Sequence, residues 1–144
     1  LLQKRLEDWQ TLAGDKQLRL HLPSPPVLWR CDHTLMLRAI DNLIGNAIRY
    51  ARHRIRIRVL SDTTQACLCV EDDGPGIDPS HYDQVFEPFI RLDPSRDRHT
   101  GGYGLGLAIV DGIMRAHAGR VTLGRSALGG ACFTLCWPQE RAPH

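Results

Sequence analysis

The chain has 144 residues, 42% of them hydrophobic and 24% charged, which suits one domain with a buried core and excludes wholesale disorder. The formal net charge of +2 is too small to indicate binding to nucleic acid. No apolar run approaches the ~20 residues that span a bilayer, and no signal-peptide pattern is present. Because the chain opens at Leu1 without a Met, we expect it to be a fragment of a longer protein.

The first half of the chain carries helical and strand patterns in turn. Residues 1–13 place apolar side chains at near-helical spacing, which predicts an amphipathic helix. Residues 17–22 alternate Leu with polar neighbours, as in a half-buried strand, and residues 27–31 suit a short strand after a Pro-rich break. A helix with one broad apolar stripe is predicted to begin at Asp32, which serves as its N-cap.

The second half predicts more strands, two helices and a long loop. Residues 54–60 alternate with a period of two, with their arginines on the polar face, and form a hairpin with residues 66–71. A short helix over 79–89 precedes a polar loop over 90–103. A further helix is stopped by Gly119, and two strands end the chain. The sum is a two-layer α/β (α+β) sandwich, with helices on one face of a mixed, mostly antiparallel sheet.

The cysteines allow two interpretations. There are five, at positions 31, 67, 69, 132 and 136, with no C-x-x-C pair. A zinc site is conceivable, because Cys67 and Cys69, and Cys132 and Cys136, could each share a face. We favour small buried hydrophobic residues on strands that are kept reduced in the cytosol. The seven histidines are scattered and indicate no metal cluster.

Three stretches carry candidate chemistry. In "DNLIGNAIRY", Asn42 and Asn46 are one helical turn apart, and they are either hydrogen-bonded core amides or oxygen ligands for Mg²⁺. In "DDGPGI", two glycines let the backbone approach a flat ligand, and a carboxylate could accept a hydrogen bond from an amino group such as adenine's. "GGYGLGL" runs into a helix, whose N-terminus favours phosphate. Each is weak evidence alone.

The order of these stretches resembles the ATP-binding domain of sensor histidine kinases, in the gyrase/Hsp90/MutL superfamily. "NLIGNAIRYA" resembles the N box, "DDGPGI" the G1 box, "VFEPFIRLD" the F box, "GGYGLGLAIV" the G2 box and "GGACFTLCWP" the G3 box. The resemblance covers the chain beyond the first helix, and residues 86–110 further resemble the EnvZ/RstB-type subgroup. It implies a Bergerat-type ATP-binding fold.

Carried onto this chain, the resemblance implies a site for ATP and Mg²⁺. Asn46 would coordinate the Mg²⁺, Asn42 would support that face, and Arg49 would reach the phosphates. Tyr50 would pack on adenine and Asp72 would accept from its amino group. Phe86 and Phe89 would anchor an ATP lid over 90–103, and Tyr103 departs from the small residue usual there. The implied nucleotide contacts are Asn42, Asn46, Arg49, Tyr50, Asp72, Gly74, Gly76, Ile77, Phe89, Gly102, Tyr103, Gly104, Leu105 and Gly106.

Several of these residues have competing interpretations. Tyr50 could be a core aromatic, and Leu105 and Leu107 are expected to pack rather than to bind through polar groups. Asp73 is expected to be a solvated turn acid or a cap. Arg96 and Arg98 could touch phosphate or simply be solvated in their loop.

The resemblance also bears on the reaction. Hydrolases of the superfamily carry a Glu where this chain has Asn42, and an amide cannot act as a general base. Transfer of the γ-phosphoryl group to a His on a separate domain is therefore expected. None of the seven histidines has a phosphoacceptor context, so the fragment should not phosphorylate itself. The alternative is a degenerate module that binds nucleotide or a partner without kinase activity.

The resemblance implies the following wider organisation. Residues 1–15 would be a helix or linker remnant from a dimerisation domain, 16–140 the catalytic domain and 141–144 a tail. The parent would be a homodimeric bacterial inner-membrane sensor with this domain in the cytoplasm, and the fragment would be monomeric. Its partners would be its own dimerisation domain and the receiver domain of a response regulator, not nucleic acid.

Overall fold

The computed structural model describes residues 2–23, 31–87 and 106–138. Residues 27–30 of the predicted strand at 27–31, and the loop at 90–103, lie outside these ranges. None of the helices in the described ranges combines the length and apolarity needed to cross a membrane. The described elements are α1 (Leu2–Ala13), β1 (Gln17–His21), α2 (His33–Tyr50), β2 (Arg54–Ser61), β3 (Gln65–Asp72), the 3₁₀ turns η1 (Pro79–His81) and η2 (Gln84–Phe86), α4 (Gly106–Ala116), β4 (Arg120–Arg125) and β5 (Ala131–Pro138).

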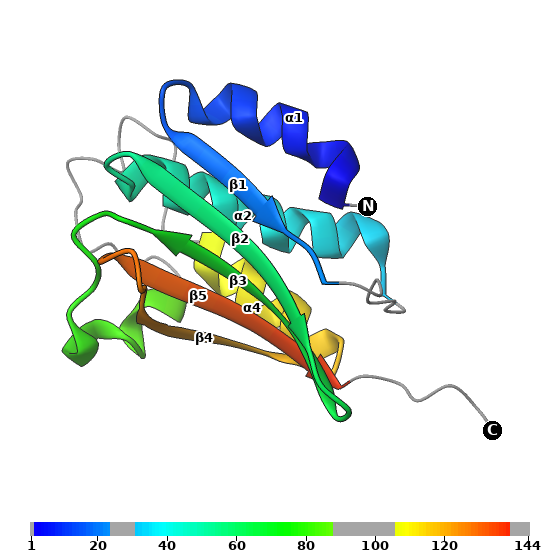
Figure 1. Ribbon diagram of the computed structural model, residues 1–144. Helices are drawn as coiled ribbons and strands as arrows, with labels where there is room; N and C mark the ends of the chain where they lie inside the picture. Colours follow the sequence, from blue (N-terminus) through cyan, green and yellow to red (C-terminus); the bar gives the residue numbers. More distant parts are fainter. Residues whose placement is uncertain (1, 24–30, 88–105, 139–144) are drawn as a thin grey trace.

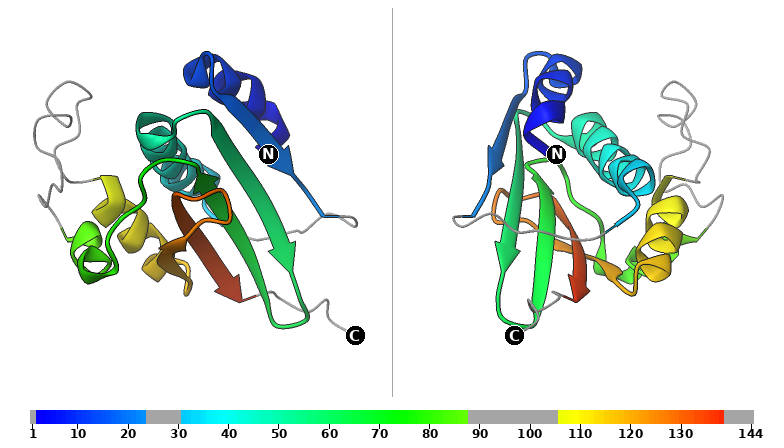
Figure 2. Two further views of the ribbon diagram at one scale, coloured as in Figure 1. Left: turned by 60° about the vertical axis from the view of Figure 1, so that its left-hand side comes forward. Right: turned by 90° about the vertical axis from the view of Figure 1, so that its right-hand side faces the viewer.

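The described strands form one mixed sheet in the order β1-β2-β3-β5-β4 (Figure 1). β1 pairs with β2 in parallel, and the other neighbours are antiparallel. The parallel pair needs a crossover, and α2 supplies it. Figure 2 shows α1, α2 and α4 on one face of the sheet and no described helix on the other, which we call the uncovered face. The predicted two-layer sandwich is confirmed.

The core lies between the helices and the covered face of the sheet. β2 alternates buried Ile55, Ile57 and Val59 with polar residues, as its period-two pattern predicts. Trp9 of α1 is 1% exposed, so the first helix contributes one of the two tryptophans of the described core, the other being Trp137 of β5. Each such fully buried apolar side chain contributes roughly 1.5–3 kcal/mol to stability.

The boundaries of several elements test the sequence predictions. Asp32 caps α2 as expected, since its carboxylate accepts from the Leu35 N–H at 3.0 Å. The prediction of one helix over 79–89 is wrong, because η1 and η2 are two separate single turns. The end of α4 also differs from the prediction: Ala118, at φ 59°, is the left-handed residue. Gly119 follows it, and its N–H bonds to Met114 O at 2.8 Å.

The expectation that all cysteines are reduced is wrong for one pair. Cys67 on β3 lies directly opposite Cys136 on β5, and the two form a disulfide. This bond also uses two of the four thiolates that a zinc site on these strands would need. Cys31, Cys69 and Cys132 are free, and Cys31 lies before α2 rather than on a strand.

Candidate functional site

Segments from three parts of the sequence meet at one end of the molecule. The C-terminal turns of α2, the end of β3 with the residues after it, and the first turn of α4 all lie at the left of Figure 1. α4 also packs against α2. The first two candidate stretches and the start of the helix after the third are therefore neighbours in space.

Asp72, the last residue of β3, is a buried acid at this end, only 2% exposed. Its Oδ1 accepts from the backbone N–H of Gly74 at 2.9 Å and of Ala131 at 3.2 Å. Burial raises the pKa of Asp72 above its ordinary value, although both hydrogen bonds oppose this shift. The carboxylate is thus fixed by its Oδ1, and no described residue donates to Oδ2.

Glycines enclose this carboxylate because side chains would not fit. A Cβ on Gly130 would overlap Asp72 Oδ1 and lie 2.6 Å from the N of Gly74. A Cβ on Gly74 would overlap the Tyr50 carbonyl oxygen at the end of α2. Gly76 has φ +74°, a conformation that favours glycine. The backbone of residues 74–76 is therefore held between the end of α2 and the start of β5.

Asp73 has a different task from its neighbour. Its carboxylate accepts from the backbone N–H groups of Arg52 at 2.8 Å, His53 at 3.0 Å and Arg54 at 3.1 Å. Partial burial would raise the pKa of Asp73, but these hydrogen bonds outweigh it and the pKa is lowered. Of the two expectations for Asp73, a solvated turn acid or a cap, the hydrogen bonds favour the cap, and they order the turn between α2 and β2.

Asn42 lies where α2 faces α4. Asn42 Oδ1 is 3.9 Å from the point where a Cβ on Gly106 would sit. The Asn42 Nδ2 is buried and has no partner among the described residues. Asn46 is half-buried one turn later, and Arg49 and Tyr50 are half-buried on the last turn. Amide oxygens suit a hard cation such as Mg²⁺, and an unpaired buried amide N–H suits an anionic oxygen.

Some of the remaining predicted site residues lie within the ranges that the structure describes, and others lie outside them. Ile77 is half-buried and packs on the core. Phe86 makes an edge-to-face contact with Phe133 of β5, with ring centroids 6.2 Å apart. The predicted contacts that lie outside the described residues are Phe89, Arg96, Arg98, Gly102, Tyr103, Gly104 and Leu105.

Three residues of this end were missed by reasoning from the sequence. Gly130 and Ala131 hold Asp72, and the Gly129-Gly130 pair at the start of a strand was the available signal. Lys16 donates from Nζ to the Ile48 carbonyl at 2.5 Å, next to the turn that carries Arg49 and Tyr50. A cation at the C-terminus of a helix is favourable, but nothing in the local sequence pairs it with α2.

Comparison with known proteins identifies the family. Residues 31–141 match the family model described as histidine kinase-, DNA gyrase B-, and HSP90-like ATPase. The sensor protein RstB of Escherichia coli is 47% identical over 137 residues, which are 95% of this chain and 32% of RstB. This chain thus spans about a third of that relative. The similarity confirms the RstB-type resemblance.

Solved structures agree with this assignment. The mycobacterial sensor histidine kinase MprB superimposes with a TM-score of 0.80 at 27% identity, covering 98% of this chain and 93% of that chain. Full-length ShkA in complex with AMPPNP gives 0.77 at 27% identity, covering 99% of this chain and 30% of that chain. The chain belongs to the histidine kinase-, DNA gyrase B- and HSP90-like ATPase family, as an ATP-binding catalytic domain of the sensor histidine kinase type.

Proposed function

We propose that this domain binds Mg²⁺–ATP at the end of the sheet marked by Asp72 and transfers the γ-phosphoryl group to a His on a separate dimerisation domain. From there the group passes to the receiver domain of a response regulator. Membership of an ATPase family supports ATP as the ligand, and the arrangement of this chain's residues supports the proposed orientation of the nucleotide. The ShkA structure, which holds AMPPNP, supports a nucleotide site in this fold.

The buried Asp72 carboxylate carries the proposal. Its Oδ1 is occupied by Gly74 and Ala131, which leaves Oδ2 to accept from the amino group of adenine. The glycine backbone beside it leaves room for a flat ring. We assign the face of that ring to Tyr50 and Ile77. A buried acid without a ligand destabilises the fold, which is typical of a binding residue.

The phosphates extend from adenine toward α2 and α4. The Asn42 Nδ2, which has no described partner, would donate to a phosphate oxygen. Asn46 would hold the Mg²⁺ through its oxygen, and Arg49 would neutralise phosphate charge. Gly106 begins α4, whose free N–H groups favour an anion. When bound, Mg²⁺ supplies charge neutralisation for phosphoryl transfer. We extend this phosphate site to Gly102, Tyr103, Gly104 and Leu105, and anchor the lid over it at Phe89.

Transfer is favoured over hydrolysis because of Asn42. An amide cannot remove a proton from water, so the position that activates water in the family's hydrolases is inert here. The acceptor then comes from outside the domain. We place the acceptor on a homodimeric parent, this domain on the cytoplasmic side of a bacterial inner membrane, and residues 16–140 as the catalytic unit.

Calorimetry with Asn46→Ala tests the metal assignment. Wild type should bind ATP more tightly with Mg²⁺ than without it, and Asn46→Ala should lose that difference while retaining metal-independent binding. Gly45→Ala is a matched control, since a Cβ at this neighbouring helical position meets no atom within 4 Å. Unchanged Mg²⁺ dependence in Asn46→Ala would show that the metal lies elsewhere.

A transfer assay separates the kinase from a degenerate module. The domain is mixed with ATP labelled at the γ-phosphate and with the dimerisation domain of its parent. Labelling of that domain's His is the expected result. If ATP binds but no label transfers, the domain is a nucleotide-binding module without kinase activity.

A further inference from the structure

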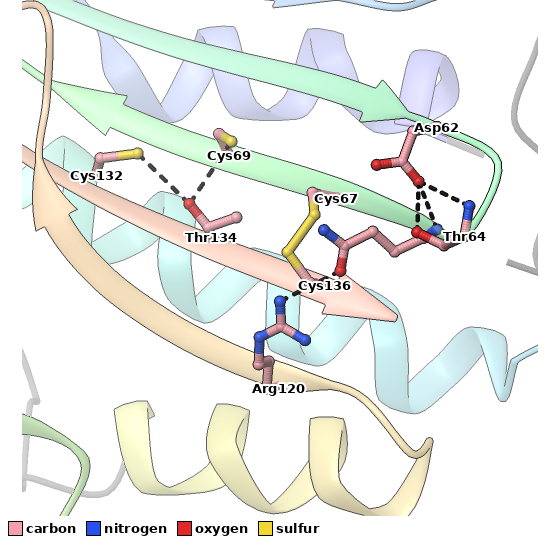
Figure 3. The surroundings of a disulfide bond; sticks show 9 residues. Asp62, Thr64, Cys67, Cys69, Arg120, Cys132, Thr134 and Cys136 are labelled. Atoms are coloured by element: carbon pink, nitrogen blue, oxygen red, sulfur yellow. Dashed lines mark hydrogen bonds between the residues drawn. A yellow bond between two sulfur atoms is a disulfide. The ribbon is translucent and has the colours of Figure 1, made fainter. Parts of the chain in front are cut away.

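The uncovered face of the sheet carries four cysteines in one patch (Figure 3). On β3 and β5 the residues of the core alternate with Cys67, Cys69, Cys132 and Cys136, so these four share the opposite face. Cys67 and Cys136 form the disulfide, whereas Cys69 and Cys132 are free. We call these four residues the cysteine patch. It lies outside the proposed ATP site.

The two free cysteines of the patch share one hydrogen-bonding partner. The Thr134 hydroxyl lies 3.6 Å from both Sγ atoms and donates to Cys69. The neighbouring Cys132 thiol lowers the pKa of Cys69 to about 6; burial opposes the shift, and Thr134 and Arg58 reinforce it. The pKa of Cys132 is raised by the same pairing. Thr134 thus joins the two free thiols, and the patch contains both kinds of group that take part in thiol–disulfide exchange, thiols and a disulfide.

The disulfide has one accessible sulfur and one protected leaving group. Cys67 is half-buried, whereas Cys136 is only 6% exposed, so an incoming thiolate reaches Cys67 first. Arg120 on β4 lies directly opposite Cys136, and its guanidinium donates to Gln65 Oε1 at 3.2 Å beside the bond. A cation at this position stabilises the negative charge of the departing Cys136 thiolate and favours its release.

We propose that the cysteine patch is a thiol–disulfide exchange site, at which a dithiol reductant opens the Cys67–Cys136 bond with Arg120 stabilising the departing thiolate. The proposal rests on the cytoplasmic placement given under Proposed function, because dithiol reductants act there and disulfides there are usually transient. It does not depend on ATP binding or on kinase activity.

The exchange balances as follows in atoms and electrons. One thiolate of the dithiol attacks Cys67 Sγ, which forms a mixed disulfide and breaks the Cys67–Cys136 bond. The electron pair of that bond goes to Cys136 Sγ, which takes a proton from solvent. The second thiolate of the dithiol then attacks the dithiol's first sulfur, which is bonded to Cys67 in the mixed disulfide. Cys67 is released as a thiolate and takes a proton from solvent. Two electrons and two protons pass from the dithiol, now a disulfide, to Cys67 and Cys136.

Thiol counting tests the state of the bond. The protein is purified without reductant, unfolded in the presence of an alkylating agent and weighed by mass spectrometry. Three of the five cysteines should react before reduction and all five after it. Five reactive thiols before reduction, in a sample that still binds ATP, would overturn the exchange site and leave the ATP proposal intact.

Native-state reduction tests the site itself. Dithiothreitol, a small dithiol, should reduce the folded wild type, and Arg120→Gln should slow that reduction by about three- to tenfold because the departing thiolate loses a neighbouring positive charge. Arg125→Gln is the matched control, because residue 125 alternates to the other face of the same strand. Reduction that requires unfolding, or equal rates in all three proteins, would show a purely structural disulfide.

Discussion

The backbone N–H of Ala131 donates to Oδ1 of Asp72 at 3.2 Å, across 59 residues of sequence. The Gly130 N–H adds a bond to the Asp72 carbonyl at 3.1 Å. Together they tie the start of β5 to the end of β3, where the candidate ATP site lies. The carboxylate is thereby oriented before any ligand arrives, which reduces the ordering cost of binding.

Asp72→Asn should weaken ATP binding while leaving the fold intact. Asn can keep the oxygen that accepts from Gly74 and Ala131, but it then presents an N–H₂ donor to the donor on adenine. Loss of one hydrogen bond to a charged group, roughly 1.5–3 kcal/mol, corresponds to about 10- to 150-fold in affinity by calorimetry. Asp78→Asn, on an exposed cap of η1, is the control and should bind normally.

The same substitution has a predicted effect on stability against pH. Because burial raises the pKa of Asp72 in the folded state, its contribution to stability is present in acid and is lost as pH rises through that folded pKa. Asp72→Asn without ligand should therefore be at least as stable as wild type at pH 7. This relative gain should shrink in acid, as thermal melts would show. If Asp72→Asn were less stable than wild type at pH 7, the Asp72 carboxylate would instead stabilise the folded state.

Gly130→Ala should lower both stability and ATP affinity. Its Cβ would overlap Asp72 Oδ1, so the carboxylate or the start of β5 must move. Overpacking of this kind costs about 1–3 kcal/mol, measurable by urea denaturation. Gly124→Ala on the neighbouring β4 meets no atom within 4 Å and is the control. Equal effects of the two substitutions would contradict the close packing at Gly130.

The local features of this fold could be predicted from the sequence. The alternation of β2, the cap at Asp32 and the hairpin of β2 with β3 each follow from residues near one another. The order of the motifs made Asp72 and Asn42 candidate site residues, and the structure places both at the same end of the sheet. These predictions needed no knowledge of the strand order beyond the hairpin.

Features set by strand register could not be predicted in this way. The disulfide depends on Cys67 lying directly opposite Cys136, which β3 and β5 fix only when they pair across 69 residues. The contact of Gly130 with Asp72 arises from the same pairing. The 3₁₀ turns at 79–86 differ from the predicted helix because single turns and short helices share one sequence pattern.

Trp9→Phe should destabilise the domain by about 1–3 kcal/mol. Trp9 Nε1 donates to Asp41 Oδ1 at 2.8 Å, and Arg5 pairs with the other oxygen of Asp41 at 2.6 Å. Phe retains most of the buried surface but loses a hydrogen bond to a carboxylate. Leu12→Ala, at a side chain 69% exposed, should change the free energy of unfolding by less than about 0.5 kcal/mol.

This comparison also tests the predicted division of the chain at residue 15. If residues 1–15 were only a linker, Trp9→Phe would be as neutral as Leu12→Ala in urea denaturation. A loss confined to Trp9→Phe would show that α1 is part of the folded unit, through its contact with α2 next to Asn42.

The end of α4 has an alanine where a glycine is usual, in the left-handed residue that follows the helix. Ala118 has φ 59°, a conformation that costs a residue with a Cβ roughly 1–2 kcal/mol. Ala118→Gly removes this strain but increases the entropy of the unfolded chain, so a net gain of about 0.5–1 kcal/mol is expected by urea denaturation. A loss of stability would contradict the left-handed conformation at this residue.

Gly119→Ala should have the opposite effect, although the sequence makes Gly119 the obvious helix stop. A Cβ there would lie 2.5 Å from the Cys136 carbonyl oxygen and 2.8 Å from Met114 Cε, so it collides with the β5 backbone. Gly112→Ala, inside α4 with no atom within 4 Å, controls for helix propensity and should stabilise by up to about 1 kcal/mol. Glycine at 119 is thus needed for its small volume against β5. The left-handed residue that ends α4 is an alanine, Ala118.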